Sequence, residues 1–576
     1  MMANRDGAPL SISVFLARRA ASEKLRGFAR FAPFALIQLA AFAILFWSEE
    51  DWPAQAAFLL FWGLLNFFWL ALLRRPATSA ALSLTFVVVL IMLSQLKHGV
   101  VMMTLTFVDL MLVDGGTFSF LMTIIPGLAW KVVITLLLLI AILALLWRSE
   151  PFRIRRHVAV AGCMGCAAAL AIVSVAAPFD REDEFFSHQY VSKFARSSVI
   201  AASELLSRGG VLEADPAVHS GLNLAMPACE SAARRKLPHI VMVFDESSFD
   251  ATMLPGVIAP QHYRDRFRSS DGKLRSLLVE GAGGPSWYTE YNMLTGLSVR
   301  SYGRFAYSVT TLAAGHVKRG LPYVLRNCGY RTYTLYSWSG TFAGARNFQT
   351  TAGIEHFLDD TQLRTGSADT DSFFYDRALD VIARERANGP VFVLVYLAMN
   401  HFPWTYHYRP DLPPHWSNPG NPFEIDEYLR RQEISRRDYV EFKQRLERDF
   451  PGAPFLLVRF GDHQPLFAKH YLEPALDAAK VAERIQERDP RYFTTYYAFE
   501  GLNFAPESLA SALDTLDAPY LPLAVLEAAG VPLDGAFAEQ KRILSRCRGL
   551  FYPCAGGAEA RRFNRLLINA GLIQGL

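Results

Sequence analysis

Residues 283–297 read GGPSWYTEYNMLTGL, a Gly-Pro turn followed by a segment of helical length. One apolar run that ends in acidic residues precedes it, since residues 239–248 read HIVMVFDESS. A second such run follows far along the chain, where residues 454–465 read PFLLVRFGDHQP. We expect these three segments to meet in space. Four of their side chains would then hold one divalent metal ion: Glu246, Ser286, Asp462 and His463.

Apolar runs alternate with helical patterns from about residue 235 onward. The runs expected to form strands are 239–244, 275–279, 331–336, 390–398, 454–460 and 493–499. The expected helices are 287–296, 315–328, 373–387, 435–448 and 506–514. Such alternation predicts an α/β domain with a mostly parallel central sheet, in which sites gather beyond the carboxyl ends of the strands. Asp245-Glu246, Asn400-His401 and Asp462-His463 each follow such a run directly.

The same segments carry a set of spaced motifs. Glu246 is followed by Ser247-Ser248-Phe249, and Ser286 lies four residues before Glu290, with Leu-Thr-Gly a little beyond. His401 is followed by Phe-Pro, and Arg346 lies seven residues before a Gly-Ile-Glu segment.

With these motifs the domain resembles the alkaline phosphatase and sulfatase superfamily. It is more similar to its membrane-anchored branch, which contains lipoteichoic acid synthases, phosphoglycerol transferases and phosphoethanolamine transferases. Two positions depart from that pattern. Ser286 stands where the nucleophile is usually Thr, and Gly344 stands where a Trp is expected, which implies a different substrate pocket.

The metal site is expected to take Zn or Mn, because carboxylate oxygens and an imidazole nitrogen are ligands for such cations. Asp245 competes with Glu246 as the upstream ligand, and the resemblance favours Glu246. A serine hydroxyl needs activation to act as a nucleophile, and a bound cation supplies it. Thr289 is the alternative nucleophile, and a plain helix N-cap is the alternative role for Ser286.

The resemblance assigns His401 to catalysis as a proton donor or phosphate contact, and Arg346 to the phosphate oxygens as a bidentate fork. His470 is a weaker candidate for contact with substrate or metal. Trp404 could line a pocket for a headgroup, as could Trp287, Trp338 and Tyr406, and core packing is the alternative for these aromatic residues.

Long apolar runs lie almost entirely before residue 180. Five of them are long enough to span a membrane, at about 31–48, 56–73, 79–96, 129–147 and 157–177. The loops with Arg74-Arg75 and with Arg148 to Arg156 are basic, and the loop at Glu49 to Asp51 is acidic, so the basic loops are expected in the cytoplasm and everything after about residue 178 outside. Residues 97–128 are expected to form an interfacial or re-entrant segment that helps to receive a lipid.

We therefore expect a membrane anchor over residues 1–177, a connector with amphipathic helices around 196–208 over residues 178–234, and a periplasmic catalytic domain over residues 235–576. Four cysteines lie outside the apolar runs: Cys229, Cys328, Cys547 and Cys554. They are expected either to pair as disulfides, with Cys547 and Cys554 close enough in sequence to suggest a local loop, or to be free buried thiols. The net charge of +4 is too small to favour a nucleic-acid partner.

The predicted function is transfer of a phospholipid headgroup, such as phosphoethanolamine or phosphoglycerol, to an envelope glycan or lipid at the bacterial inner membrane. A sulfate or phosphate ester hydrolase and an inactive envelope scaffold are the alternatives. Ser286 is followed by neither the Pro nor the Arg of a formylglycine sulfatase motif, which argues against that class.

Overall fold

The computed structural model describes residues 31–101, 103–112, 122, 127–177, 188–208, 210–222, 229, 237–366, 369–414 and 418–574. The chain forms two compact units. We call Met1–Met111 with Leu121–Ser203 the helical unit, and Leu112–Phe120 with Glu204–Leu576 the sheet unit. The division after Ser203 falls inside the expected connector.

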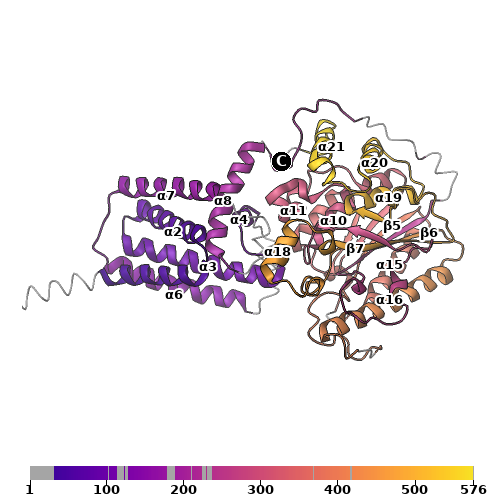
Figure 1. Cartoon of the computed structure of the whole chain (residues 1–576), viewed down its shortest axis with the longest axis horizontal. Helices are drawn as coiled ribbons and strands as arrows, with labels where there is room; N and C mark the ends of the chain where they lie inside the picture. Colours follow the sequence, from indigo (N-terminus) through magenta and orange to yellow (C-terminus); the bar gives the residue numbers. More distant parts are fainter. Residues whose placement is uncertain are drawn as a thin grey trace, which may run out of the picture. The chain divides into compact units, whose positions relative to one another are not determined.

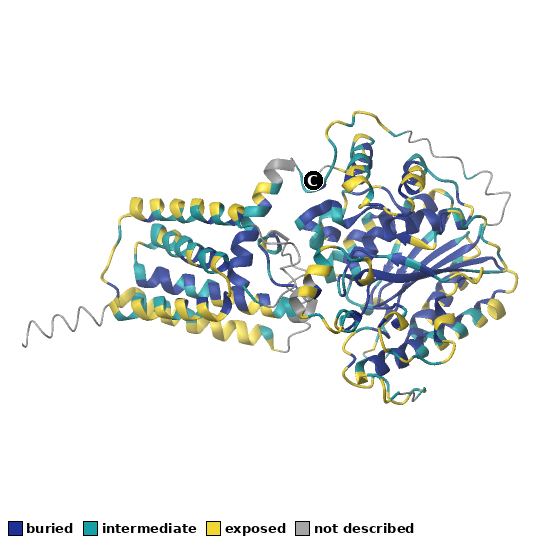
Figure 2. Ribbon diagram, in the orientation of Figure 1, coloured by how far each residue is buried: buried dark blue, intermediate teal, exposed yellow. Residues whose placement is uncertain are grey.

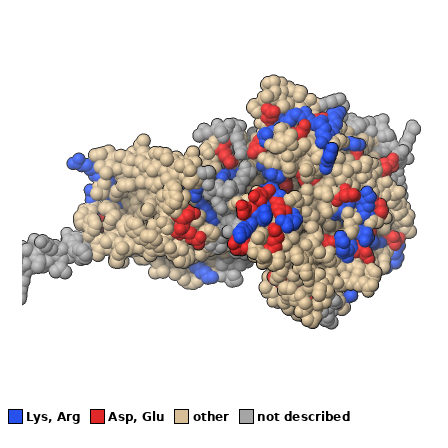
Figure 3. Space-filling view, viewed as in Figure 1, with Lys and Arg blue, Asp and Glu red and all other residues tan. Residues whose placement is uncertain are grey.

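Five helices of the helical unit are long and apolar enough to cross a membrane: Phe31–Ser48, α2 (Trp52–Leu73), α3 (Pro76–Val101), α6 (Leu128–Ser149) and α7 (Arg156–Ala176). They confirm the five spans expected from the sequence. Asp51 begins α2 as its N-cap, where its carboxylate accepts a hydrogen bond from the Ala54 amide at 2.7 Å. Figure 3 shows that charged side chains are sparse over this unit and gather over the sheet unit.

The expected amphipathic helix is α8 (Tyr190–Arg208), which is longer than predicted. Its first half is buried within the helical unit, where Tyr190, Val191 and Phe194 pack against residues of the membrane-length helices. Much of the expected re-entrant segment lies outside the described residues. Its described part includes α4 (Phe107–Leu112), held by an ion pair of 2.9 Å between Lys97 and Asp109.

One sheet organises the sheet unit, with strand order β4-β3-β5-β1-β6-β7-β2-β8 (Figure 1). The strands are β1 (His239–Asp245), β2 (Arg275–Leu278), β3 (Arg331–Leu335), β4 (His356–Leu358), β5 (Val391–Tyr396), β6 (Phe455–Gly461), β7 (Thr494–Leu502) and β8 (Thr515–Asp517). All pairings are parallel except those of β7 with β6 and β2. The mostly parallel α/β sheet is therefore confirmed, with β4 and β8 as strands too short to stand out in the sequence.

Helices cover both faces of the sheet, and the buried residues follow the same layers (Figure 2). The helices α15 (Asp371–Glu385) and α16 (Phe423–Asp449) pack on one face, against a core that includes Val241, Val393 and Leu457. The other face is covered by α10 (Ser286–Thr295) and α19 (Leu521–Ala528) (Figure 1). Burial on both faces explains why the central strands are apolar without alternation.

Several expected helices differ in the structure. Of the expected helix 315–328 only α12 (Leu321–Asn327) forms, and a separate short helix, α11 (Val309–Ala313), precedes that range. The expected helix 435–448 is only the second half of α16. The prediction of a helix at 506–514 is wrong. That segment is irregular because its backbone bonds to other elements: the Asp514 carbonyl accepts from the Ser276 amide at 2.8 Å, and the Glu507 amide donates to Ala528 at 2.9 Å.

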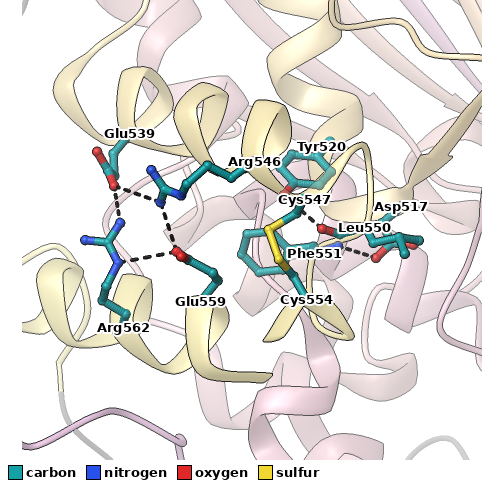
Figure 4. The surroundings of a disulfide bond; sticks show 10 residues. All are labelled: Asp517, Tyr520, Glu539, Arg546, Cys547, Leu550, Phe551, Cys554, Glu559 and Arg562. Atoms are coloured by element: carbon teal, nitrogen blue, oxygen red, sulfur yellow. Dashed lines mark hydrogen bonds and ion pairs between the residues drawn. A yellow bond between two sulfur atoms is a disulfide. The ribbon is translucent and has the colours of Figure 1, made fainter. Parts of the chain in front are cut away.

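The four cysteines outside the membrane-length helices form two disulfides, Cys229–Cys328 and Cys547–Cys554. Figure 4 shows the second, which ties the end of α20 (Gly535–Cys547) to the turn before α21 (Ala558–Asn569). Ion pairs join the two helices beside it, with Arg546 and Arg562 each contacting both Glu539 and Glu559. The alternative of four free thiols is excluded in this structure.

Candidate metal and phosphoryl-transfer site

The site lies where β1 and β6 end side by side. The two strands are parallel and in register, with Asp245 opposite Gly461, so the residues that follow them meet at one edge of the sheet. The backbone of Gly461 lies very close to that of Ser248, since a Cβ added to Gly461 would lie 1.8 Å from the backbone oxygen of Ser248. Only glycine fits there, and it allows Asp462 to accept a hydrogen bond of 2.8 Å from the Ser247 amide.

Ser286 reaches this strand edge from the first residue of α10. Its Oγ lies 3.2 Å from Glu246 Oε2 and 3.2 Å from His463 Nε2. The helix ends at Gly296, whose left-handed backbone (φ 70°) accounts for the Leu-Thr-Gly motif. Because a helix N-terminus favours negative charge, the position of Ser286 suits an anionic phosphoryl group.

Glu246, Asp462 and His463 form a tight buried cluster. One ligand atom of each lies within 4.8 Å of the others, and His463 Nε2 is 3.4 Å from Glu246 Oε1 and 3.3 Å from Asp462 Oδ2. The Nδ1 atom of His463 is 2.8 Å from the Gln464 carbonyl, which fits donation there and leaves Nε2 facing the cluster.

The electrostatics of the cluster fit a cation. Burial and the charge of Glu246 raise the pKa of Asp462, and burial would raise that of Glu246 too, but the hydrogen bond and charge of His463 lower it. The Oδ2 atom of Asp462 is buried and has no hydrogen-bond partner. An orphaned carboxylate oxygen beside a second carboxylate, an imidazole nitrogen and a hydroxyl is a donor set that suits Zn or Mn.

Asp245 points to the other face of the sheet. Its carboxylate pairs with Arg266 at 3.2 Å and accepts a hydrogen bond from Tyr496 at 2.5 Å. Alternation along β1 therefore separates the two neighbouring acids, and Glu246 is the one beside Ser286. Thr289, the alternative nucleophile, is fully buried and donates its hydroxyl to the backbone oxygen of Asp462 at 2.7 Å.

His401 follows β5, on the other side of β1. Its ring packs against Trp338 at 5.2 Å between ring centroids, and burial lowers its pKa. Its backbone oxygen accepts a hydrogen bond of 2.8 Å from Arg431 of α16. The sequence did not single out Arg431, because it lies in a strongly charged segment that resembles a solvated helix.

The remaining predicted substrate residues lie in different settings. Arg346 is half-exposed, pairs with Asp359 at 2.5 Å and lines a cavity of about 590 Å³. Trp404 is 4% exposed and packs against Tyr428 and Phe467, which is the core-packing alternative. His470 is exposed on the short helix α17 (Ala468–Leu472), and among the described residues it is not part of the metal cluster.

Comparison with known proteins gives one family match: the Sulfatase family model matches residues 286–486. The predicted resemblance to the sulfatase superfamily is thereby confirmed over this stretch. Comparison with curated proteins gives no match.

Solved structures with a similar fold include the following three. The Streptococcus pyogenes phosphoglycerol transferase GacH, in complex with sn-glycerol-1-phosphate, has 14% identity over 64% of this chain and 97% of that chain, with a TM-score of 0.46. The Neisseria meningitidis lipooligosaccharide phosphoethanolamine transferase EptA has 14% identity over 71% and 82%, with a TM-score of 0.37. The C-terminal periplasmic domain of Escherichia coli EcEptC, in a complex with Zn, has 12% identity over 52% and 84%, with a TM-score of 0.36.

Proposed function

We propose that this protein is a metal-dependent transferase of the bacterial inner membrane, which moves a phospholipid headgroup through Ser286 to an envelope glycan or lipid. The carrying observation is that Ser286 Oγ lies 3.2 Å from both Glu246 Oε2 and His463 Nε2, at the first residue of a helix. The Sulfatase match, which begins at Ser286, supports an ester-cleaving site of this type.

The metal site of this proposal consists of Glu246, Asp462 and His463 with the Ser286 hydroxyl. A divalent cation bound there would lower the pKa of that hydroxyl and offset the negative charge of the phosphoryl oxygens. In the first step, Ser286 Oγ bonds to the headgroup phosphorus and releases its proton to solvent. The bond from phosphorus to the diacylglycerol oxygen breaks, and that oxygen leaves with a proton supplied by His401.

In the second step, an acceptor hydroxyl gives its proton to His401, which restores the donor of the first step, and its oxygen bonds to the phosphorus on Ser286. The Oγ–phosphorus bond breaks, and Oγ takes back a proton from solvent. Arg346 is proposed as a phosphate contact during these steps, once it is released from Asp359. His470 and Trp404 remain weaker proposals for substrate contact, since one is exposed on α17 and the other is buried.

The placement outside the cytoplasm rests on the basic loops of the helical unit and on the two disulfides, which persist in oxidising compartments. Hydrolysis is the second candidate, because the matching family model is Sulfatase. The two reactions differ only in whether water or a glycan hydroxyl is the acceptor. Product analysis with and without an added sugar acceptor separates them.

The test of the proposal is covalent labelling of Ser286. The purified full-length protein is exposed to membrane phospholipids, and intact mass and peptide mapping report the mass added. We expect a phosphorylated headgroup on Ser286, no adduct in Ser286→Ala, and a retained adduct in Ser286→Thr. The matched control is Ser545→Ala, which removes an exposed serine of α20 and should label as the wild type. Undiminished labelling of Ser286→Ala would refute the assignment.

A further inference from the structure

A second polar cavity lies on the face of the sheet covered by α16. Its volume is about 520 Å³, and its walls come from α16, β6, β7 and the short helix η3 (Tyr263–Phe267). The lining includes none of the four proposed metal-site residues. A cavity of this size holds a small organic ligand rather than only a few waters.

Positive charge predominates in this cavity. Six cationic side chains line it: Arg266, Arg268, Arg436, Arg437, Lys443 and Arg459. The acidic side chains of the lining are three: Asp265, Glu433 and Glu500. Three cations therefore exceed the carboxylates of the lining, and Asp245, which pairs with Arg266 from outside the lining, reduces the excess to about two positive charges.

Two cationic side chains for each carboxylate are also found in the individual ion-pair clusters. Glu433 is shared by Arg436 and Arg437, with distances of 2.7 and 3.2 Å. Glu500 is shared by Lys443 and Arg459, with distances of 2.7 and 3.1 Å. Each carboxylate can neutralise only one of its two cations, so each pair leaves donors for a further anion.

The acidic partners stay ionised in this setting. Burial alone would raise the pKa of Glu433 and Glu500, but the neighbouring arginines and Lys443 lower it. The excess of positive charge is therefore present at neutral pH.

The inner wall of the cavity is built from buried arginines. Arg266 and Arg459 are 4% and 5% exposed, and the Nε atom of each is buried without a hydrogen-bond partner. Arg459 is held in place by its position in β6 and by stacking over Tyr439 at 4.1 Å, and Arg266 pairs with Asp245. Buried guanidinium groups beneath the more exposed Arg436 and Arg437 at the rim are an arrangement that suits phosphate oxygens.

We propose that this cavity binds the phosphate group of a small phosphomonoester, at a site separate from Ser286. The charge excess matches a phosphomonoester, whose charge is close to two at neutral pH, better than a single carboxylate. Such a ligand occurs either as a free sugar phosphate or as a substituent of a longer glycan. The cavity goes beyond the proposed transfer reaction and does not depend on it.

The test is a binding titration of the full-length protein in detergent, in the Ser286→Ala background and after removal of metal by chelation and dialysis. Glucose 6-phosphate and phosphorylated dextran are compared at equal phosphate concentration, with glucose as the uncharged control. Saturable binding of the small phosphate identifies a free ligand, and binding of the dextran alone identifies a glycan-borne one. If calorimetry gave the same heat of binding for glucose as for the phosphates, or if neither phosphate bound saturably, the proposal would be overturned.

Variants at the rim locate the binding. The double variant Arg436→Gln/Arg437→Gln should weaken binding at least about tenfold, because it removes two donors to phosphate. Glu433→Gln should strengthen binding about threefold or more, since it frees both arginines from their carboxylate. The matched control is Arg377→Gln/Arg384→Gln on the neighbouring α15, which should bind as the wild type.

If the rim variants bind as the wild type, or the control weakens as much as the rim double variant, the proposal is wrong. Labelling of Ser286 in proteins that retain this serine reports separately on the transferase.

Discussion

At the scale of single residues, the directions of two neighbouring acidic side chains determine which of them lies at the proposed metal site. Asp245 and Glu246 are consecutive, yet one pairs with Arg266 below the sheet and the other lies beside Ser286 at its edge. Strand geometry sends consecutive side chains to opposite faces, so the two carboxylates cannot serve the same site. Their identical charge hides this difference in the sequence.

Substitution of either acid by its amide should therefore affect a different property of the protein. Glu246→Gln should lower metal affinity by at least about 100-fold, because loss of a ligand exceeds the effect of losing an outer partner. Asp245→Asn should keep the metal but lower the free energy of unfolding by about 3–5 kcal/mol, because it leaves the buried Arg266 without its charge partner.

Elemental analysis of the purified variants measures the bound metal, and denaturant unfolding measures stability. Each variant is the control for the other, since the positions are adjacent and the change in volume is small. Loss of metal from Asp245→Asn with retention in Glu246→Gln would contradict the proposed ligand set.

At the scale of elements, the site depends on how closely β1 and β6 end. Gly461 permits contact with the backbone of Ser248, and α10 then brings Ser286 to the edge where the two strands end.

The edge strand β8 shows that strand ends elsewhere in the sheet can hold an acid for structural reasons alone. Asp517 at its end accepts a hydrogen bond from the Phe551 amide at 2.6 Å, and burial raises its pKa to about 7.

Asp517 should make the sheet unit less stable as the pH rises from about 4 to about 7. In the unfolded chain this carboxyl loses its proton near pH 4, whereas in the folded protein it keeps the proton up to about pH 7, so deprotonation favours unfolding within this window. Asp517→Asn cannot ionise, and it should gain roughly 1–4 kcal/mol relative to the wild type between pH 4 and pH 8.

Guanidinium unfolding at several pH values measures this difference. Asp360→Asn, at a partly exposed acid that begins the short helix α14 (Asp360–Leu363), is the control and should show no such pH-dependent gain. A difference between Asp517→Asn and wild type that is constant with pH would show that Asp517 is ionised in the folded state.

At the scale of the whole molecule, the two disulfides differ in how much chain they restrain. Cys229–Cys328 closes a loop with a sequence separation of 99, whereas Cys547–Cys554 has a separation of 7. In the chain-entropy account, a longer loop loses more freedom in the unfolded state when it is closed.

Removal of the long-range disulfide should therefore destabilise the protein more. The double variant Cys229→Ala/Cys328→Ala should lose about 4–5 kcal/mol and Cys547→Ala/Cys554→Ala about 2–3 kcal/mol. Denaturant unfolding under non-reducing conditions measures both, and the free pair Cys163→Ala/Cys166→Ala is the control. Equal losses for the two disulfides would contradict this entropic explanation.

The basic loops of the helical unit predict on which side of the membrane each part of the chain lies, and labelling can test this. In a background without Cys163 and Cys166, Ser545→Cys should react with a membrane-impermeant maleimide in cells with a permeabilised outer membrane. Arg153→Cys, in a basic loop, should react only after the inner membrane is opened. The opposite pattern would place the sheet unit in the cytoplasm and refute the proposed periplasmic reaction.

The sequence by itself determined the five apolar helices, the mostly parallel sheet and the three segments that carry the cluster. These follow from local composition, since span length and uninterrupted apolar strands leave a direct mark on the chain. The match of the family model over residues 286–486 confirms the class that the motifs indicated.

Only the tertiary structure decided which of two adjacent acids faces Ser286, that Cys229 pairs with Cys328, and that Trp404 is part of the core. It also revealed the cationic cavity, whose walls bring η3 together with α16, β6 and β7, which follow it by more than 150 residues. The physical reason is that side-chain direction and long-range pairing depend on register and packing between elements, which no single stretch of sequence encodes.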